Sequence, residues 1–311
     1  NGAVADALVT GERGRIPAET TTALQDSGLA HILAISGFNM AIMAGALFGF
    51  TRATLALVPV LALRLPLKKI AALAGFIGAI FCLVISGAAS PAARAFVMIA
   101  LMLLALLLDR PALSMRNLAL AALVLLLLAP ETLLDAGFQM SFAAVVGLMA
   151  VFEWYAGWRA AGSQSDPREK PGLARRALRF GGGIVASTVV AGLAVAPLAT
   201  FHFQKMSQLG LLANLIAVPL FAFYIMPLVL VALIAMPFGL EAMPLLALDQ
   251  GVQLMLAVAH AVAGIEGAAA RVPQMPLAAL VSIMLGGLWL ALWRQRWRLL
   301  GLVGIGAGAK E

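Results

Sequence analysis

Cysteine is almost absent from the sequence, since only Cys82 occurs among 311 residues. A disulfide framework and a metal site built of several thiolates are therefore excluded. The three histidines, at 31, 202 and 260, lack the close spacing of a metal motif, and no HxxxH or HxHxD pattern occurs. The phosphate-binding motif GxxxxGK[ST] is also missing, so ATP hydrolysis would have to come from a partner. We expect no catalytic site, no metal site and no cofactor in this chain.

Charged residues are scarce as well, at 11% of the chain, whereas 63% of residues are hydrophobic and the mean hydropathy is +1.01. The apolar runs are far longer than a soluble core requires, and spanning segments in lipid are normally helices. The composition therefore predicts an all-α polytopic integral membrane protein. Its formal charge of +7 is expected from cytoplasmic loops alone, so it is weak evidence for binding to nucleic acid.

Apolar runs long enough to cross a bilayer predict nine to ten transmembrane helices, some of them broken or kinked around a polar vestibule. Nine are expected at 29–50, 70–88, 92–108, 117–130, 138–157, 180–200, 209–236, 248–267 and 277–293. The run after Arg52 is too short to cross and is expected to lie along the interface. Three prolines, Pro219, Pro227 and Pro237, predict a kink in the seventh helix.

The loops alternate in charge, which predicts their sides. Fifteen basic residues lie in four loops, at 52–69, 110–116, 157–179 and 294–298, which we assign to the cytoplasm. The other loops hold only Arg94, Lys205 and Arg271 and are assigned to the outer side, together with the N-terminus.

Three domain ranges follow from the same pattern. Residues 1–27 are polar and are expected to follow a truncated outer domain, residues 28–298 form the transmembrane domain, and residues 299–311 begin a truncated further span. Residues 157–179 form the longest hydrophilic insert, and we expect a cytoplasmic linker that divides two membrane halves.

Polar residues collect near the outer ends of the predicted helices and in the outer loop at 201–208. Because polar groups inside a membrane are costly and usually face protein or water, this arrangement predicts a vestibule. Gly37 offers a place where the first helix can bend or break. The predicted vestibule residues are His31, Ser36, Gly37, Asn39, Ser90, Arg94, Gln139, Ser141, Phe201, His202, Lys205 and Asn214.

Ordinary structural roles would also account for several of these residues. Ser90 precedes a proline and would suit the N-cap of the third helix. Ser36 and Ser141 would serve as hydrogen-bond donors between helices, and Arg94 could reach the outer headgroups. Glycines at 37, 45 and 49 have a spacing that suits close helix packing.

Local catalysis finds little support in the first span. His31 and Ser36 are five residues apart, about 140° around a helix, so they cannot act as base and nucleophile unless a break at Gly37 turns them together.

Four stretches, in order, resemble ComEC-type competence proteins, the bacterial channels for DNA uptake in natural transformation. They are LAHILAISGFNM, SGAASPAARAFVMIALMLLALLLDR, APETLLDAGFQMSFAAVVGL and APLATFHFQKMSQLGLLANLIAVPL. The first departs at Asn39, where the family commonly has a histidine, so a metal-binding role there is doubtful.

The resemblance implies a channel that carries single-stranded DNA from the periplasm to the cytoplasm across the inner membrane. It also implies an OB-like outer domain before this segment and a metallo-hydrolase-like domain after it, which would hold any nuclease activity. An outer DNA receptor and a cytoplasmic helicase-like motor are the expected partners.

Two other functions stay open from the sequence. One is a small-solute secondary transporter, which would need an ion-coupling carboxylate inside the membrane. The other is a membrane scaffold for an attached hydrolase. The acidic residues that could serve the transporter, Glu131, Asp135, Glu153, Glu241, Asp249 and Glu266, lie near the ends of predicted helices.

Overall fold

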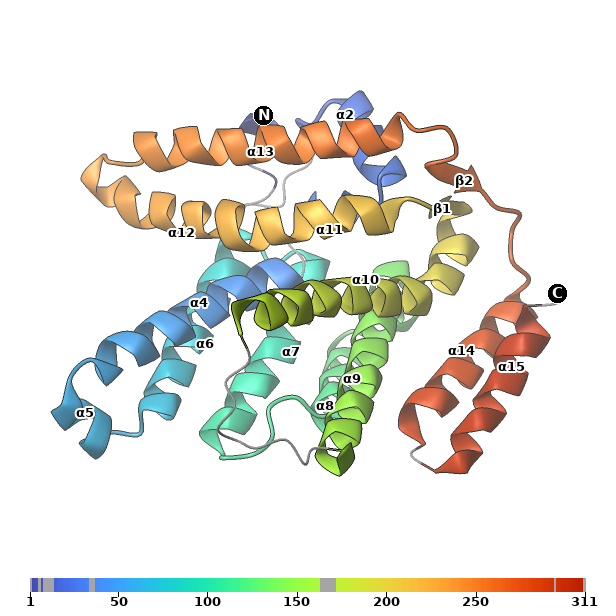
Figure 1. The fold of residues 1–311 in the computed structure, drawn as a ribbon, viewed down its shortest axis with the longest axis horizontal. Coiled ribbons are helices and arrows are strands. Elements are labelled where there is room, and N and C mark those ends of the chain that lie inside the picture. The colour runs from blue at the N-terminus through green and yellow to red at the C-terminus, as the bar shows by residue number, and fades with distance from the viewer. Residues whose placement is uncertain are drawn as a thin grey trace. The chain divides into compact units, whose positions relative to one another are not determined.

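The computed structural model describes residues 2–4, 7, 14–33, 37–162, 172–293 and 295–309 (Figure 1). These residues are mostly helical, as predicted for an all-α membrane protein, and they include two short strands. Contacts divide the chain into two compact units. Unit 1 comprises residues 1–132 and 212–268, and unit 2 comprises residues 133–211 and 269–311.

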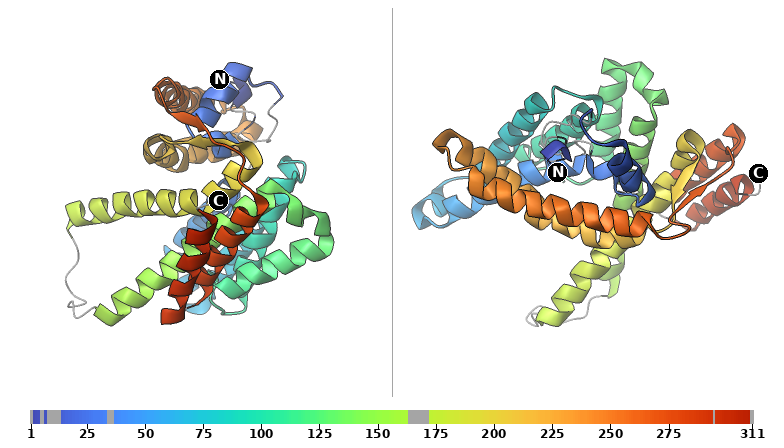
Figure 2. Two further views of the ribbon diagram at one scale, coloured as in Figure 1. Left: turned by 90° about the vertical axis from the view of Figure 1, so that its right-hand side faces the viewer. Right: turned by 90° about the horizontal axis from the view of Figure 1, so that it is seen from above.

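Unit 1 draws its helices from two separate parts of the sequence. The first part contains α2 (Ala18–Asp26), α3 (Ala30–Leu33), α4 (Gly37–Ala56), α5 (Pro59–Arg64), α6 (Leu67–Ile85), α7 (Ser90–Leu107) and α8 (Met115–Leu128). The second contains most of α11 (Gly210–Leu220), then a π-helical turn (Phe221–Ile225), α12 (Met226–Ala235), a 3-10 turn (Met236–Phe238) and α13 (Ala242–Ala263). Helices α12 and α13 lie side by side in both views, and α2 packs on α13 (Figures 1 and 2).

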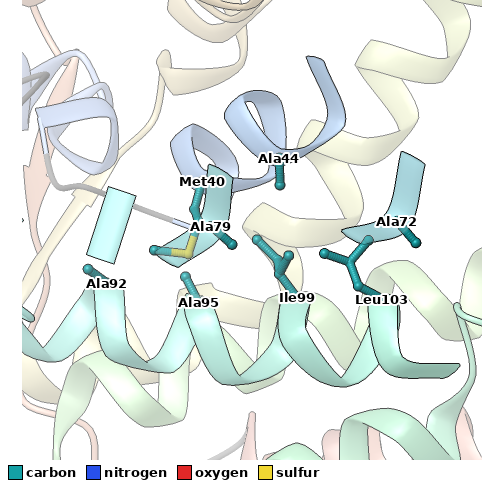
Figure 3. Packing of buried hydrophobic residues seen from close by; sticks show 8 residues of the cluster. All are labelled: Met40, Ala44, Ala72, Ala79, Ala92, Ala95, Ile99 and Leu103. Atoms are coloured by element: carbon teal, nitrogen blue, oxygen red, sulfur yellow. The ribbon is translucent and has the colours of Figure 1, made fainter. Parts of the chain in front are cut away.

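The core of the first part forms where α4, α6 and α7 meet (Figure 3). The buried face of α6 consists of Ala71, Ala72, Gly75, Gly78 and Ala79. A Cβ atom added at Gly75 would lie 3.0 Å from the carbonyl oxygen of Ala44 in α4. Small side chains on α6 thus let the two backbones approach closely, as is common between membrane helices.

The glycines predicted to mark a packing face on the first span do not do so. A Cβ at Gly45 or Gly49 would have no atom within 4 Å, and one at Gly37 would make only an ordinary 3.7 Å contact with Ala95. The close-packing glycines of this cluster lie on α6 instead.

The predicted count of nine to ten crossings is not confirmed. Six helices of the described chain are long and apolar enough to span a bilayer. They are Leu67–Ile85, Ser90–Leu107, Ala136–Trp158, Leu178–Phe203, Gly210–Phe238 and Ala242–Ala263. Three apolar helices are shorter, at Met115–Leu128, Leu277–Leu292 and Trp297–Gly308.

The first predicted span also differs in its limits. The structure has a short helix at Ala30–Leu33 and a longer one that begins at Gly37, while residues 34–36 lie outside the described chain. Helix α4 continues past Arg52 to Ala56, so the apolar segment after Arg52 is partly this helix, and Pro59 opens α5. Proline suits such a first-turn position because the amide hydrogen that it lacks would have no helical partner there.

The proline-rich segment is irregular, as its prolines predict. A π-helical turn at Phe221–Ile225 lies between Pro219 and Pro227. Since proline cannot donate a backbone hydrogen bond, the regular pattern is interrupted near it. Gly251 of α13 faces this turn, because a Cβ there would lie 2.8 Å from Cδ1 of Tyr224.

Unit 2 consists of α9 (Ala136–Gly162), α10 (Leu173–Phe203), β1 (Lys205–Ser207), β2 (Ala269–Arg271), α14 (Leu277–Leu292), a 3-10 turn (Arg296–Leu299) and α15 (Leu300–Gly308). A 3-10 turn at Pro130–Leu134 precedes it. Helices α9 and α10 extend into the predicted 157–179 loop from both sides. The boundaries between the two units fall at residues 132, 211 and 268 and not in the 157–179 segment.

One ion pair in unit 1 agrees with the predicted alternation of the loops. In unit 1, Lys69 near the start of α6 forms a 2.7 Å ion pair with Asp109 just after α7. The side-chain hydrogen bond from Lys69 lowers the pKa of the Asp109 carboxyl. The cytoplasmic loops predicted at 52–69 and 110–116 therefore meet at the same end of this helix pair.

Helices α14 and α15 form a hairpin held by glycines. A Cβ atom added at Gly286 would lie 2.5 Å from the carbonyl oxygen of Gly301, and one at Gly304 would lie 3.2 Å from the carbonyl oxygen of Ser282. The predicted further span after Arg298 is present only as α15, which has nine residues.

Substitution of Gly286 should test this packing. Gly286→Ala should destabilise the hairpin by about 1–3 kcal/mol, because the new methyl group overlaps the α15 backbone. The neighbouring Gly287 has nothing within 4 Å of an added Cβ, so Gly287→Ala should be neutral or stabilise by up to about 1 kcal/mol. Thermal unfolding of both variants in detergent would measure the difference. Equal melting temperatures for the two variants would contradict the packing.

Candidate functional site

The predicted vestibule residues fall into two groups, one in each unit, and each group is described separately. Unit 1 holds His31, Gly37, Asn39, Ser90, Arg94 and Asn214, whereas unit 2 holds Gln139, Ser141, Phe201, His202 and Lys205. Ser36 lies outside the described residues.

The starts of α4 and α7 lie together in unit 1, as predicted. Gly37 faces Ala95, and Met40 packs in the same cluster as Ala92 and Ala95 (Figure 3). Asn39, one residue before Met40, is only 4% exposed. The first turns of these two helices therefore bring a buried amide to the end of the bundle that also carries Arg94.

Arg94 is buried within an otherwise apolar helix, with 7% of its surface exposed. Its Nη1 donates a 2.8 Å hydrogen bond to Oγ of Ser90, one turn earlier. Ser90 is not the N-cap that the sequence suggested, because Ala89 holds that position and Ser90 is already helical. Its hydroxyl instead holds a guanidinium that keeps its charge at any ordinary pH.

The other two predicted polar residues of unit 1, His31 and Asn214, have different surroundings. His31 is exposed, and its Nδ1 lies 3.0 Å from the carbonyl oxygen of Gly28 in the preceding turn. Asn214, in α11, has a buried Oδ1 atom with no hydrogen-bond partner among the described residues. Because an unsatisfied buried oxygen is costly, Asn214 is a position where a donor from water or a ligand would be favourable.

Gln139 and His202 join the start of α9 to the end of α10 in unit 2. His202 Nε2 lies 2.9 Å from Oε1 of Gln139, so a ring N–H at this nitrogen donates to the amide oxygen. The Gln139 amide nitrogen donates in turn to the carbonyl oxygen of Leu133, at 3.0 Å. The two predicted residues are thus neighbours although 63 positions separate them, and both helix ends belong to one side, as the loop charges predicted.

Aromatic residues flank both members of this pair in the sequence. Phe201 meets the His202 ring edge-to-face at a centroid distance of 5.2 Å, and Phe203 lies at 6.4 Å. On α9, Phe138 and Phe142 are 4.5 Å apart. Ser141, one turn from Phe138, is partly buried in the same helix. Phe138 is buried, whereas Phe203 is 60% exposed, so of these rings Phe203 is the best placed for contact with another molecule.

Most of the outer loop predicted at 201–208 has regular secondary structure. Phe201, His202 and Phe203 complete the last turn of α10, and Gln204 ends it in a left-handed conformation with φ 53°. Lys205–Ser207 then pairs antiparallel with Ala269–Arg271, and Lys205 stands opposite Arg271. From the sequence, Arg271 is predicted only to be a basic residue of an outer loop. Three-residue strands carry too little periodic pattern to be recognised, so no local signal could have found this pairing.

The described residues contain no group of three or more His, Cys, Asp or Glu side chains that could hold a metal ion. An open apolar depression of about 300 Å³ lies between α14 and α15, lined by Leu285, Gly286, Trp289, Leu300 and Gly301. None of the predicted vestibule residues lines it. The chemistry of the two groups is therefore that of hydrogen-bonding, cationic and aromatic side chains.

A double-mutant cycle would measure the Gln139–His202 bond. Gln139→Leu and His202→Phe should show a coupling of about 0.5–1.5 kcal/mol, the usual net contribution of one such bond. The measurement is thermal unfolding of the two single variants and the double variant in detergent. Ser187→Ala, elsewhere on α10, serves as the control and should add simply to Gln139→Leu. Additive effects of the 139 and 202 changes would show that the bond contributes nothing.

Comparisons with known proteins agree with the expectation from the sequence. The family model described as "Competence protein" matches residues 8–297. The chain is 29% identical over 230 residues to ComE operon protein 3 of Bacillus subtilis (strain 168), which is 72% of this chain and 25% of that protein. It is 27% identical over 227 residues to uncharacterized protein YcaI of Escherichia coli (strain K12), 73% of this chain and 28% of that protein.

The chain therefore spans about a quarter of the length of these curated relatives. No solved structure matches it. The family model covers nearly the whole chain, including every predicted vestibule residue. The chain belongs to the competence protein family.

Proposed function

We propose that this chain forms the part of a bacterial inner-membrane channel through which single-stranded DNA passes from the periplasm to the cytoplasm. Membership of the competence protein family and the multi-pass helical structure support a role in DNA uptake. We further infer that the substrate is single-stranded DNA, that the chain itself forms the channel, and that transport runs inward.

The burial of Arg94 is the observation on which this proposal rests. A permanently charged side chain buried in an apolar membrane helix is costly, and such residues usually mark a substrate path. Arg94 lies in the first turns of α7, beside the start of α4 with its buried Asn39. A guanidinium binds phosphate through two parallel hydrogen bonds, which are strong where water is scarce. It would contact any strand equally, since phosphate contacts carry no sequence information.

The second group supplies the other half of the chemistry. Exposed Phe203 and the neighbouring rings of Phe201 and His202 offer flat faces on which bases could stack. Stacking tolerates every base because each has a π-face, and it commonly accompanies a cationic groove in proteins that bind single strands. Lys205 follows Phe203 after one residue, Gln204.

The proposal also includes the orientation of the chain in the membrane and its partners. We place its N-terminus in the periplasm and assign no enzymatic activity to these residues, so that any nuclease would belong to a separate metallo-hydrolase-like domain. An outer DNA receptor would deliver the strand, and a cytoplasmic helicase-like motor would pull it.

A secondary transporter of small solutes is the second candidate, and one observation favours it. Asp249 lies well inside α13 rather than at its end, and its Oδ2 accepts a 2.7 Å hydrogen bond from the Gln253 amide. A carboxylate within a spanning helix is a common element of ion coupling. Loss of solute uptake, rather than DNA uptake, in an Asp249→Asn strain would favour this candidate.

The test follows labelled duplex DNA in cells that lack the gene, and measures periplasmic and cytoplasmic label separately. In the deletion strain we expect label to reach the periplasm and never to become protected from nuclease in the cytoplasm. Complementation with Arg94→Ala should lower cytoplasmic label about tenfold or more, because a charge-assisted bond contributes about 1.5–3 kcal/mol. Arg94→Lys should retain part of the activity.

Arg52→Ala is the matched control, since Arg52 lies near the other end of α4 and on the predicted cytoplasmic side. Immunoblots of membrane fractions would show whether each variant reaches the membrane. Normal cytoplasmic label in the deletion strain would remove the channel proposal altogether.

A further inference from the structure

The apolar depression of the α14–α15 hairpin lies close to the turn that joins the two helices (Figure 1). Trp289 of α14 and Leu300, the first residue of α15, both line it. All of its lining residues are leucine, glycine or tryptophan. The depression therefore suits a hydrocarbon chain. Its one polar side-chain group, the indole N–H of Trp289, already has a partner in the turn.

Trp297 joins the turn to this depression through its backbone. Its carbonyl oxygen accepts a 2.8 Å hydrogen bond from Nε1 of Trp289 on α14. The same oxygen accepts a hydrogen bond from the backbone N–H of Leu300. Two residues that line the depression are thus bonded to one backbone oxygen of the turn, so the turn is held beside the depression.

The turn is basic, and no acidic residue is near it in the sequence. Arginine occupies positions 294, 296 and 298, and residues 267–310 contain no aspartate or glutamate. The side chain of Arg298 is half-buried, and no hydrogen bond or ion pair joins its guanidinium to another residue of the described chain. Arg298 comes two residues before Leu300. A guanidinium next to an apolar surface is stabilised by an anion, and phosphate is one that it binds well.

Tryptophans place the same turn at the boundary between membrane and water. Positions 289, 293 and 297 hold three of the five tryptophans in the chain. The rings of Trp289 and Trp293 lie 4.9 Å apart, and Trp293 and Trp297 are 49% and 64% exposed. Tryptophan collects at the level of lipid headgroups because its ring is amphipathic. Leu285, one helical turn farther from the loop than Trp289, then lies at the depth of the acyl chains.

We propose that the α14–α15 hairpin binds an anionic phospholipid, with one acyl chain in the apolar depression and the phosphate beside Arg298. Charge complementarity selects this occupant over a zwitterionic lipid, since basic pockets between membrane helices bind anionic headgroups. A second copy of the chain would bring its own basic turn to the same level of the membrane, and repulsion disfavours that contact. The site does not depend on the proposed transport of DNA.

Quenching of Trp289 fluorescence by brominated lipid tests the site. In the intact protein, every tryptophan except Trp289 is replaced with phenylalanine. The bond from Trp289 to residue 297 is retained, because its acceptor is a backbone oxygen. The protein is reconstituted in phosphatidylcholine vesicles that contain increasing fractions of phosphatidylglycerol or phosphatidylcholine with brominated chains. Phosphatidylglycerol should bind at least about fivefold more tightly, the preference expected of one basic side chain near the membrane surface.

Substitutions of Arg298 separate the site from the general charge of the protein. Arg298→Gln should lower the preference for phosphatidylglycerol about fivefold, whereas Arg298→Lys should retain most of it because the charge remains. Arg116→Gln is the matched control, since it makes the same charge change in another loop assigned to the cytoplasm. Arg116 is exposed and belongs to unit 1, so this variant should keep the full preference.

Four results would overturn the proposal. Equal quenching by the two brominated lipids would show that the depression accepts any acyl chain. An equal loss of preference in Arg116→Gln and Arg298→Gln would assign the effect to diffuse surface charge. Absence of quenching by either lipid would show that another segment or a second copy covers the depression. Recovery of fluorescence on addition of soluble glycerophosphate would assign Arg298 to free phosphate instead of lipid.

Discussion

Close approach between helix backbones is the constraint on which both units depend. Within a membrane, burial of apolar side chains gives little advantage, because lipid is as apolar as leucine, so helices associate through tight contact. Glycine and alanine provide that contact at Gly75 between α6 and α4, at Gly147 between α9 and α10, and at Gly286 between α14 and α15. The same principle operates at Gly251, where α13 receives the ring of Tyr224 from the π-helical turn.

The polar residues of the predicted vestibule lie near the ends of the packed helices rather than along their middles. Arg94 and Asn39 lie near the starts of α7 and α4, while Gln139 and His202 lie at the adjoining ends of α9 and α10. At these ends the helix leaves backbone groups without helical partners, so local polar partners are favourable. The bond of Gln139 to the backbone of Leu133 is one example. The residues that we propose for contact with DNA therefore occur where a membrane helix best tolerates polar groups.

The sequence predicted the helical membrane class and which helix ends share a side, because hydropathy and loop charge record these properties directly. Four ordered stretches of sequence predicted the family. The sequence also placed Gln139 and His202 on the same outer side through that topology. The sequence predicted one helix at 29–50 where the structure has two, Ala30–Leu33 and Gly37–Ala56. Hydropathy does not show where one helix ends and the next begins within a continuous apolar run. The Lys205–Arg271 pairing could not be foreseen, because tertiary contacts alone determine the register of such short strands.

The ribbon between β1 and β2 has a consequence for how the protein is made. Its strands flank residues 208–268, which include α11, α12 and α13. During synthesis from the N-terminus, β1 leaves the ribosome long before its partner, so unit 2 cannot be completed until these three helices have been made. Closing a loop of this length also costs entropy that local helix pairs such as α6 and α7 avoid. Assembly of this protein should thus begin with neighbouring hairpins and finish with the joining of strands that were synthesised far apart in time.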